Sequence, residues 1–238
     1  MANKKYDIHR IDFVFVLQIS SMSAVLFELK PTLRGRFHQI AFYIYAICSL
    51  YLIFSTRTGI VRIAFALYLA TVNNMLYISS ILHTIDWMRP ELEERVQKVD
   101  HASIFLLIAG SYTPTCLSCL PQGHPASLYI LISTWIIALA GIVKCILYTN
   151  VSRALNVGFY FLCGLTVVPY LPLITEHLSL WMMAAFASGG AMYLAGGMIY
   201  GLKKPDPIPE HFGYHEIFHI LTILANLCFI VPILSCSM

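Results

Sequence analysis

The chain has 238 residues, of which 58% are hydrophobic and 11% are charged, with a formal net charge of +3. An ordinary soluble domain carries about 25% charged residues, so a soluble fold of this length could not bury so much apolar surface, and lipid must cover part of it. The small net charge gives no indication of a nucleic-acid partner. Composition therefore predicts an α-helical, multi-pass protein of the cell membrane.

The first apolar segment, residues 11–28, is short and is interrupted by glutamine and serine side chains. Basic residues flank it on both sides: Lys4, Lys5 and Arg10 before it, and Lys30, Arg34 and Arg36 after it. Basic flanks stay in the cytoplasm, so a membrane crossing here would leave one of these flanks outside. We therefore predict an interfacial or re-entrant helix at about 11–28 within a cytoplasmic N-terminal segment, 1–37. An uncleaved signal-like start is the alternative.

Seven later stretches each have the roughly 20 mainly apolar residues that cross a hydrocarbon core about 30 Å thick. They lie at about 38–56, 63–84, 102–120, 127–148, 154–174, 180–201 and 215–236. The loops between them are short, and none is long enough for a soluble domain. The sequence thus predicts an all-α integral membrane protein in which residues 38–238 form one bundle of seven transmembrane helices.

The basic residues of the loops predict the orientation of this bundle. Ten of them fall on the side that carries the N-terminus: Lys30, Arg34, Arg36, Arg89, Arg95, Lys98, Lys144, Arg153, Lys203 and Lys204. Two fall on the opposite side, Arg57 and Arg62. This asymmetry predicts a cytoplasmic N-terminus and a C-terminus outside.

Two histidines at the start of the last predicted span have the spacing of a metal chelate. His215 and His219 are four residues apart, so both rings project from one helix face, about 5–6 Å apart at Cβ. The string from His215 to His219 also matches the H-E-x-x-H pattern of zinc proteases. Those enzymes take a third ligand downstream, a His, Glu or Asp. Residues 220–238 contain none of these, so a third ligand must come from upstream.

The predicted topology selects the candidates for that ligand. His83 lies at the cytoplasmic end of the second span, and Asp100 lies at the cytoplasmic start of the third. Ser79 precedes His83 by one turn on the same helix face. Three helices thus bring four potential ligands to one depth, and we expect a zinc ion held by His83 together with the histidine pair.

The other histidines are interpreted as lying outside this site: His9, His38, His101, His124, His177 and His211. Most are taken as interfacial or solvated side chains, because a single histidine at a helix end usually is one. His38 belongs to this group, since it has no partner at chelating spacing in the sequence. His101 follows Asp100 directly, so its ring is expected to point about 100° away around the helix.

Three ordered motifs of the chain are similar to those of one known family. Ser79 to His83 looks like an S-x-x-x-H at the end of the second span, and residues 99–114, VDHASIFLLIAGSYTP, are similar to a third-span signature. Residues 212–219, FGYHEIFH, match an H-x-x-x-H in the seventh span. Over about residues 30–238 the chain resembles the hemolysin III branch of the progestin and adipoQ receptor superfamily. That family's acidic, Asn and Thr-His signature near the first helix is replaced here by RGRFH at residues 34–38.

The resemblance implies a seven-span fold and three zinc ligands, His83, His215 and His219. It also implies that Asp100 hydrogen-bonds to water on the zinc and that Ser79 lies close by. The family accepts other residues between its last two histidines, so Glu216 is expected to be dispensable.

Three protein ligands with one open position are typical of catalytic zinc, whereas structural zinc usually has four. Zinc lowers the pKa of bound water to about 7 and polarises carbonyl oxygens. Asp100 is then the expected general base and Ser79 the group that orients the substrate carbonyl. We expect zinc-dependent hydrolysis of a lipid amide, ceramide-like by the family resemblance. The alternatives are a non-enzymatic receptor or regulator in which zinc ties three helices together, and a cytolytic pore, which needs polar residues along the whole membrane depth.

Overall fold

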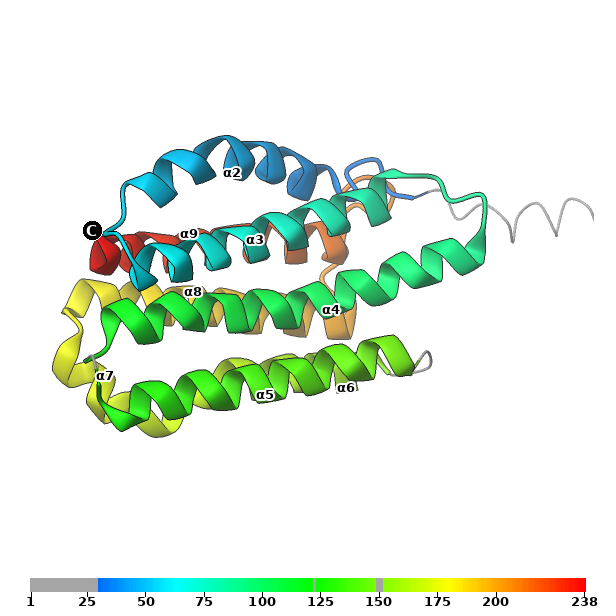
Figure 1. The fold of residues 1–238 in the computed structure, drawn as a ribbon. Helices are drawn as coiled ribbons and strands as arrows, with labels where there is room; N and C mark the ends of the chain where they lie inside the picture. Colours follow the sequence, from blue (N-terminus) through cyan, green and yellow to red (C-terminus); the bar gives the residue numbers. More distant parts are fainter. Residues whose placement is uncertain (1–29, 122, 149–151) are drawn as a thin grey trace, which may run out of the picture.

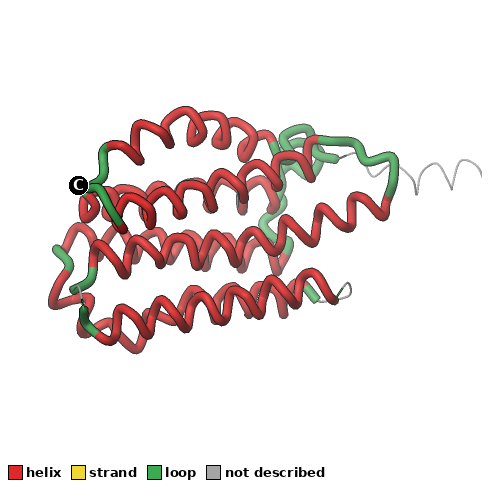
Figure 2. The backbone as a smooth tube through the Cα atoms, in the orientation of Figure 1, coloured by secondary structure: helices red, strands yellow, loops and turns green. Residues whose placement is uncertain are grey.

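The computed structural model describes residues 30–121, 123–148 and 152–238 of the chain. Within these residues, seven helical spans are long and apolar enough to cross a membrane, and they lie side by side in one bundle (Figures 1 and 2). The protein is therefore a seven-helix integral membrane protein, as the sequence predicts. The predicted interfacial helix at about 11–28 lies outside the described residues.

Continuous helices form five of the spans: α2 (Arg36–Phe54), α3 (Ile60–Thr84), α5 (Pro125–Leu147), α8 (Leu180–Leu202) and α9 (Tyr214–Ser237). The third span is α4 (Pro90–Pro114), which continues as a π-helical turn, η1 (Thr115–Cys119). The fifth span has three parts: α6 (Arg153–Gly164), the 3₁₀ segment η2 (Leu165–Tyr170) and α7 (Leu171–His177). Both irregular spans contain proline, which lacks the N–H that a regular helix requires.

The helix that contains the third span begins earlier than predicted. It starts at Pro90, whereas the apolar stretch was expected at about 102–120. Proline at the first helical turn and the acidic Glu91 and Glu93 beside it favour a helix start, since they suit the unpaired N–H groups and the positive end of the helix dipole. Hydropathy alone does not detect this polar extension.

Helix α3 packs between α2 and α4 and also contacts α9. Its side chains Phe65, Tyr68, Leu69, Val72 and Leu76 are fully buried or nearly so, and they pack in one apolar cluster with residues of α2 and α9. A second cluster surrounds Phe105 and joins α4 to α5 and α6. Many large apolar side chains lie exposed on the outer faces of the helices, as expected where lipid is the solvent.

A close approach between α3 and α4 depends on a glycine. Gly110 of α4 faces Thr71 of α3, and a Cβ built on Gly110 would lie 3.0 Å from the Cβ of Thr71 and closer still to its hydroxyl. Thr71 is itself buried, and its hydroxyl donates to the carbonyl oxygen of Tyr68. Thr71 therefore has no free space into which to move. Small residues at such positions let two membrane helices pack closely.

Gly110→Ala is expected to destabilise the bundle by about 1–3 kcal/mol, the usual cost of overpacking a core. The matched control is Gly158→Ala in α6, where a built Cβ meets no atom within 4 Å and the change only improves helix propensity. Thermal unfolding of both purified variants in detergent measures the difference. Equal melting temperatures for the two variants would contradict the close packing of α3 on α4.

Candidate metal centre

The structure brings the three predicted metal-binding histidines together at one end of the bundle. His83 lies at the end of α3, and His215 and His219 lie in the first two turns of α9. One ligand-capable nitrogen from each ring lies within 4.8 Å of the other two, and no other three His, Cys, Asp or Glu side chains of the described residues form such a group. We call this region of the bundle the histidine end.

The geometry of these rings is compatible with zinc. Nε2 of His215 lies 3.2 Å from Nε2 of His83. Two nitrogens bound to the same tetrahedral zinc lie about 3.3 Å apart, because each Zn–N bond is about 2.0–2.1 Å long. In addition, Nδ1 of His219 is buried with no hydrogen-bond partner among the described residues, an arrangement that costs free energy unless something satisfies it. The donor set therefore fits zinc, although metal binding itself stays a prediction.

The start of α9 is built so that both of its histidines face inward. Gly213 precedes the helix, and its backbone N–H donates to a carboxylate oxygen of Glu216 at 2.8 Å, a capping interaction that satisfies one of the free N–H groups of the helix start. With the helix start held in this way, His215 and His219 point into the bundle, where both are buried.

Glu216 has a second partner that sequence reasoning did not foresee. Its side chain is fully buried, and its other carboxylate oxygen accepts a hydrogen bond from Nε of Arg34 at 2.6 Å. Arg34 lies just before α2, so this ion pair connects the entrance to the first span with the helix that carries two of the histidines. The expectation that Glu216 is dispensable took account of the family pattern but not of this contact.

The prediction that His38 lies outside the site is wrong. Its ring is 1% exposed and stacks on the ring of His219, with centroids 3.8 Å apart and an interplanar angle of 11°. Its Nδ1 lies 2.9 Å from Oγ of Ser79. No spacing in the sequence indicates this contact, because His38 lies in the first turn of α2 and His219 lies on the last helix.

The other histidines divide into two groups. His124, His177 and His211 are exposed, as predicted. His101 lines the same cavity as the three clustered histidines but does not belong to their metal-capable group. His9 lies outside the described residues.

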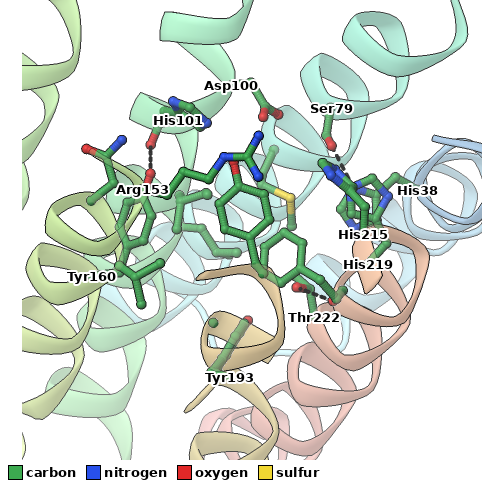
Figure 3. Close-up of a pocket in the computed structure, with 18 of the residues that line it drawn as sticks. His38, Ser79, Asp100, His101, Arg153, Tyr160, Tyr193, His215, His219 and Thr222 are labelled. Atoms are coloured by element: carbon green, nitrogen blue, oxygen red, sulfur yellow. Dashed lines mark hydrogen bonds between the residues drawn. The ribbon is translucent and has the colours of Figure 1, made fainter. Parts of the chain in front are cut away.

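Asp100 and Ser79, the two predicted polar neighbours, are both buried and line that cavity, which has a volume of about 550 Å³. Figure 3 shows their side chains beside the rings of His38, His215 and His219, with Arg153 reaching across the same space. Proximity of these residues to the histidines is thus a feature of the structure, while their catalytic roles stay predictions.

The cavity is polar at the histidine end and apolar farther along the bundle. Its lining continues past the histidines to Leu107, Leu194 and Phe229 on α4, α8 and α9. His215 and Phe229 are 14 residues apart on α9, so this lining extends over about 20 Å at 1.5 Å per residue. An amphiphile with one polar group and a long apolar chain matches such a space.

Arg34→Ala is expected to lower the free energy of unfolding by about 3 kcal/mol, because it leaves the buried Glu216 carboxylate without its cation. Arg34→Ala combined with Glu216→Gln should recover part of this loss, since the unpaired charge is then gone. Arg36→Ala is the matched control, because Arg36 is exposed and its side chain, among the described residues, bonds to the side chain of Gln39 alone. Denaturant titration in detergent compares the four proteins, and equal loss in Arg34→Ala and Arg36→Ala would argue against the ion pair.

Comparison with known proteins agrees with the fold and the motifs. A family model described as "Haemolysin-III related" matches residues 28–230. Hemolysin-3 of Bacillus cereus is 27% identical over 161 residues, 68% of this chain and 69% of that protein. A Hemolysin-3 homolog of Bacillus subtilis (strain 168) is 32% identical over 147 residues, 61% of this chain and 64% of that protein, so this match spans less than two thirds of that relative. Because the family model covers most of the chain, this multi-pass membrane protein belongs to the haemolysin-III related family.

Proposed function

We propose that the protein is a zinc-dependent hydrolase of a membrane lipid amide of ceramide-like chemistry. The observation that carries this proposal is the location of the histidine cluster at the polar end of a long apolar cavity. Three histidines leave one zinc position open, which is the arrangement of catalytic rather than structural zinc sites. A substrate that enters the cavity would have its amide beside the histidines and its acyl chain along the apolar lining.

Each residue of the site has a distinct part in this reaction. Bound zinc would supply Lewis-acid polarisation of the amide carbonyl and activation of water. Hydrolysis forms a C–O bond from water and breaks the amide C–N bond. Asp100, buried on the cavity wall, accepts a proton from the water and delivers it to the leaving nitrogen as the C–N bond breaks.

Ser79 and the apolar lining assist the same reaction by positioning. The Ser79 hydroxyl faces the cavity one turn before His83, where it can donate a hydrogen bond to the carbonyl oxygen as negative charge develops there. Leu107, Leu194 and Phe229 bind the acyl chain and exclude water from the polar end. Binding of the chain away from the reacting bond fixes the amide in place, which lowers the entropy cost of reaction.

The names of the relatives indicate haemolysis, but we do not propose a pore as the mechanism. A conducting path needs polar residues along the whole membrane depth. In the described residues, the charged side chains and the histidines of the cavity gather at the histidine end, and the rest of its lining is mainly apolar, with groups such as Phe229 and Leu165. Loss of lipid integrity through hydrolysis is a simpler route from this site to membrane damage.

The purified protein is expected to contain one zinc ion per chain. His83→Ala and His219→Ala should each lose most of it, because two remaining ligands hold zinc far more weakly than three. His177→Ala is the matched control, since His177 is exposed at the end of the bundle opposite the cluster. Elemental analysis of the four proteins after dialysis against zinc-free buffer measures the occupancy. Full zinc occupancy in His83→Ala would show that the ion binds elsewhere.

Asp100→Asn should reduce lipid-amide hydrolysis by about 10²–10⁴-fold, the range attributed to a general acid–base group, while zinc stays bound. Asp86→Asn is the matched control, because Asp86 is exposed in the loop between α3 and α4. The measurement is release of fatty acid from ceramide-like lipid in mixed micelles, with zinc content determined on the same samples. Wild-type turnover by Asp100→Asn would refute the role of Asp100. Zinc-loaded wild type that releases no fatty acid would favour the non-enzymatic receptor or regulator.

A further inference from the structure

We propose that His38 is a positioning residue of the metal centre, which supports the ring of His219 by stacking and the hydroxyl of Ser79 by a hydrogen bond. The inference rests on the metal site of the proposed function and adds to it a residue from the first span. His38 reaches both contacts from a single ring, although it precedes Ser79 by 41 residues and is far from α9 in the sequence.

Stacking by His38 compensates for a missing hydrogen bond at His219. A metal-binding histidine usually donates its second ring N–H to a carboxylate or carbonyl oxygen, which fixes the orientation of the ring. Nδ1 of His219 has no such partner among the described residues. Its ring is instead covered face to face by His38 at 3.8 Å, while His215 meets it edge-on with centroids 4.6 Å apart. The flat contact with His38 therefore restricts rotation of the His219 ring.

The hydrogen bond to Ser79 gives His38 a second effect on the site. In the tautomer that carries its hydrogen on Nδ1, His38 donates to Oγ of Ser79, 2.9 Å away. The hydroxyl hydrogen of Ser79 is then directed to the cavity side, where the Asp100 carboxylate or a substrate carbonyl oxygen can accept it. In Figure 3 the Ser79 hydroxyl lies directly above the stacked histidines, with Asp100 on its other side. His38 thus orients a group that the proposed reaction uses.

The residues at the start of α2 hold His38 in position for its contacts with His219 and Ser79. Gly35, at the start of α2, has a φ of +74°, and a Cβ there would lie 2.7 Å from Cβ of His83. Only glycine combines this backbone conformation with so close an approach. Arg34, the preceding residue, pairs with Glu216 of α9. The chain before His38 is therefore anchored to both helices that carry the clustered histidines.

Three substitutions separate the two contacts. His38→Phe keeps a flat ring but has no nitrogen, His38→Asn keeps a hydrogen-bonding atom near the position of Nδ1 but has no ring, and His38→Ala removes both. We expect His38→Ala and His38→Asn to bind Co²⁺ about 10–100-fold more weakly than wild type, the usual cost of losing an outer contact of a ligand. His38→Phe should bind Co²⁺ almost as tightly as wild type. Titration of the metal-free full-length proteins in detergent, followed by Co²⁺ absorption, measures the affinities.

At saturating metal, the turnover of His38→Asn and His38→Phe should follow the opposite order to their Co²⁺ affinities. His38→Asn is expected to retain most of the wild-type kcat because Ser79 keeps its partner, whereas His38→Phe should have a lower kcat with an unchanged KM. His177→Ala is the control for both measurements. Equal Co²⁺ affinity in His38→Ala and wild type, or equal losses in His38→Phe and His38→Ala, would overturn the proposal. If the wild-type protein hydrolyses no lipid amide, the proposed function fails. The order of Co²⁺ affinities alone then tests whether His38 positions the metal centre.

Discussion

The hydrocarbon interior of the membrane offers no hydrogen-bond partners, and this constraint determines the rest of the structure. Backbone polar groups must bond within helices, and large apolar side chains can face outward. Polar and ionisable side chains are stable at depth only where they bind one another, a ligand or a metal. In this protein several of the buried ones line one cavity: His38, Ser79, Asp100, His215 and His219.

The first span contributes more contacts to the site than its largely exposed surface suggests. Most of α2 faces outward, with only His38, Ala41 and Tyr45 buried. Yet the residues at its start contact three components of the site: Arg34 pairs with Glu216, Gly35 approaches His83, and His38 stacks on His219. A buried carboxylate is costly to leave unpaired, so the Arg34–Glu216 pair favours one arrangement of α2 against α9. The position of His38 follows from that arrangement.

The cavity relates the family to the proposed chemistry. Its polar end holds a donor set that suits zinc, and its apolar portion follows the helices over about 20 Å. Neither feature alone indicates a lipid substrate, because histidine clusters also occur in structural sites and apolar cavities bind many ligands. Together, at one end of a membrane bundle, they favour a lipid whose reactive bond lies at the boundary between its polar and apolar parts.

Much of this protein could be predicted from its sequence alone. Apolar stretches of suitable length identify the seven spans, since helix rise and membrane thickness are both constant. The four-residue spacing of His215 and His219, with the basic residues of the loops, predicts that His83 and Asp100 lie at their depth, because topology alone fixes depth in a membrane. The histidine spacing and topology also favoured zinc, the family resemblance implied the same three ligands, and the identity of the metal stays a prediction.

Only the tertiary structure revealed the contacts of His38, the Arg34–Glu216 pair and the cavity. Each depends on which way a helix is rotated about its own axis against its neighbours. Hydropathy does not encode this rotation when a helix such as α2 is apolar on most of its faces. Arg34 and Glu216 are 182 residues apart, so no local spacing could connect them. Helix packing decides such pairs because it selects, among all the side chains at one depth, those that meet.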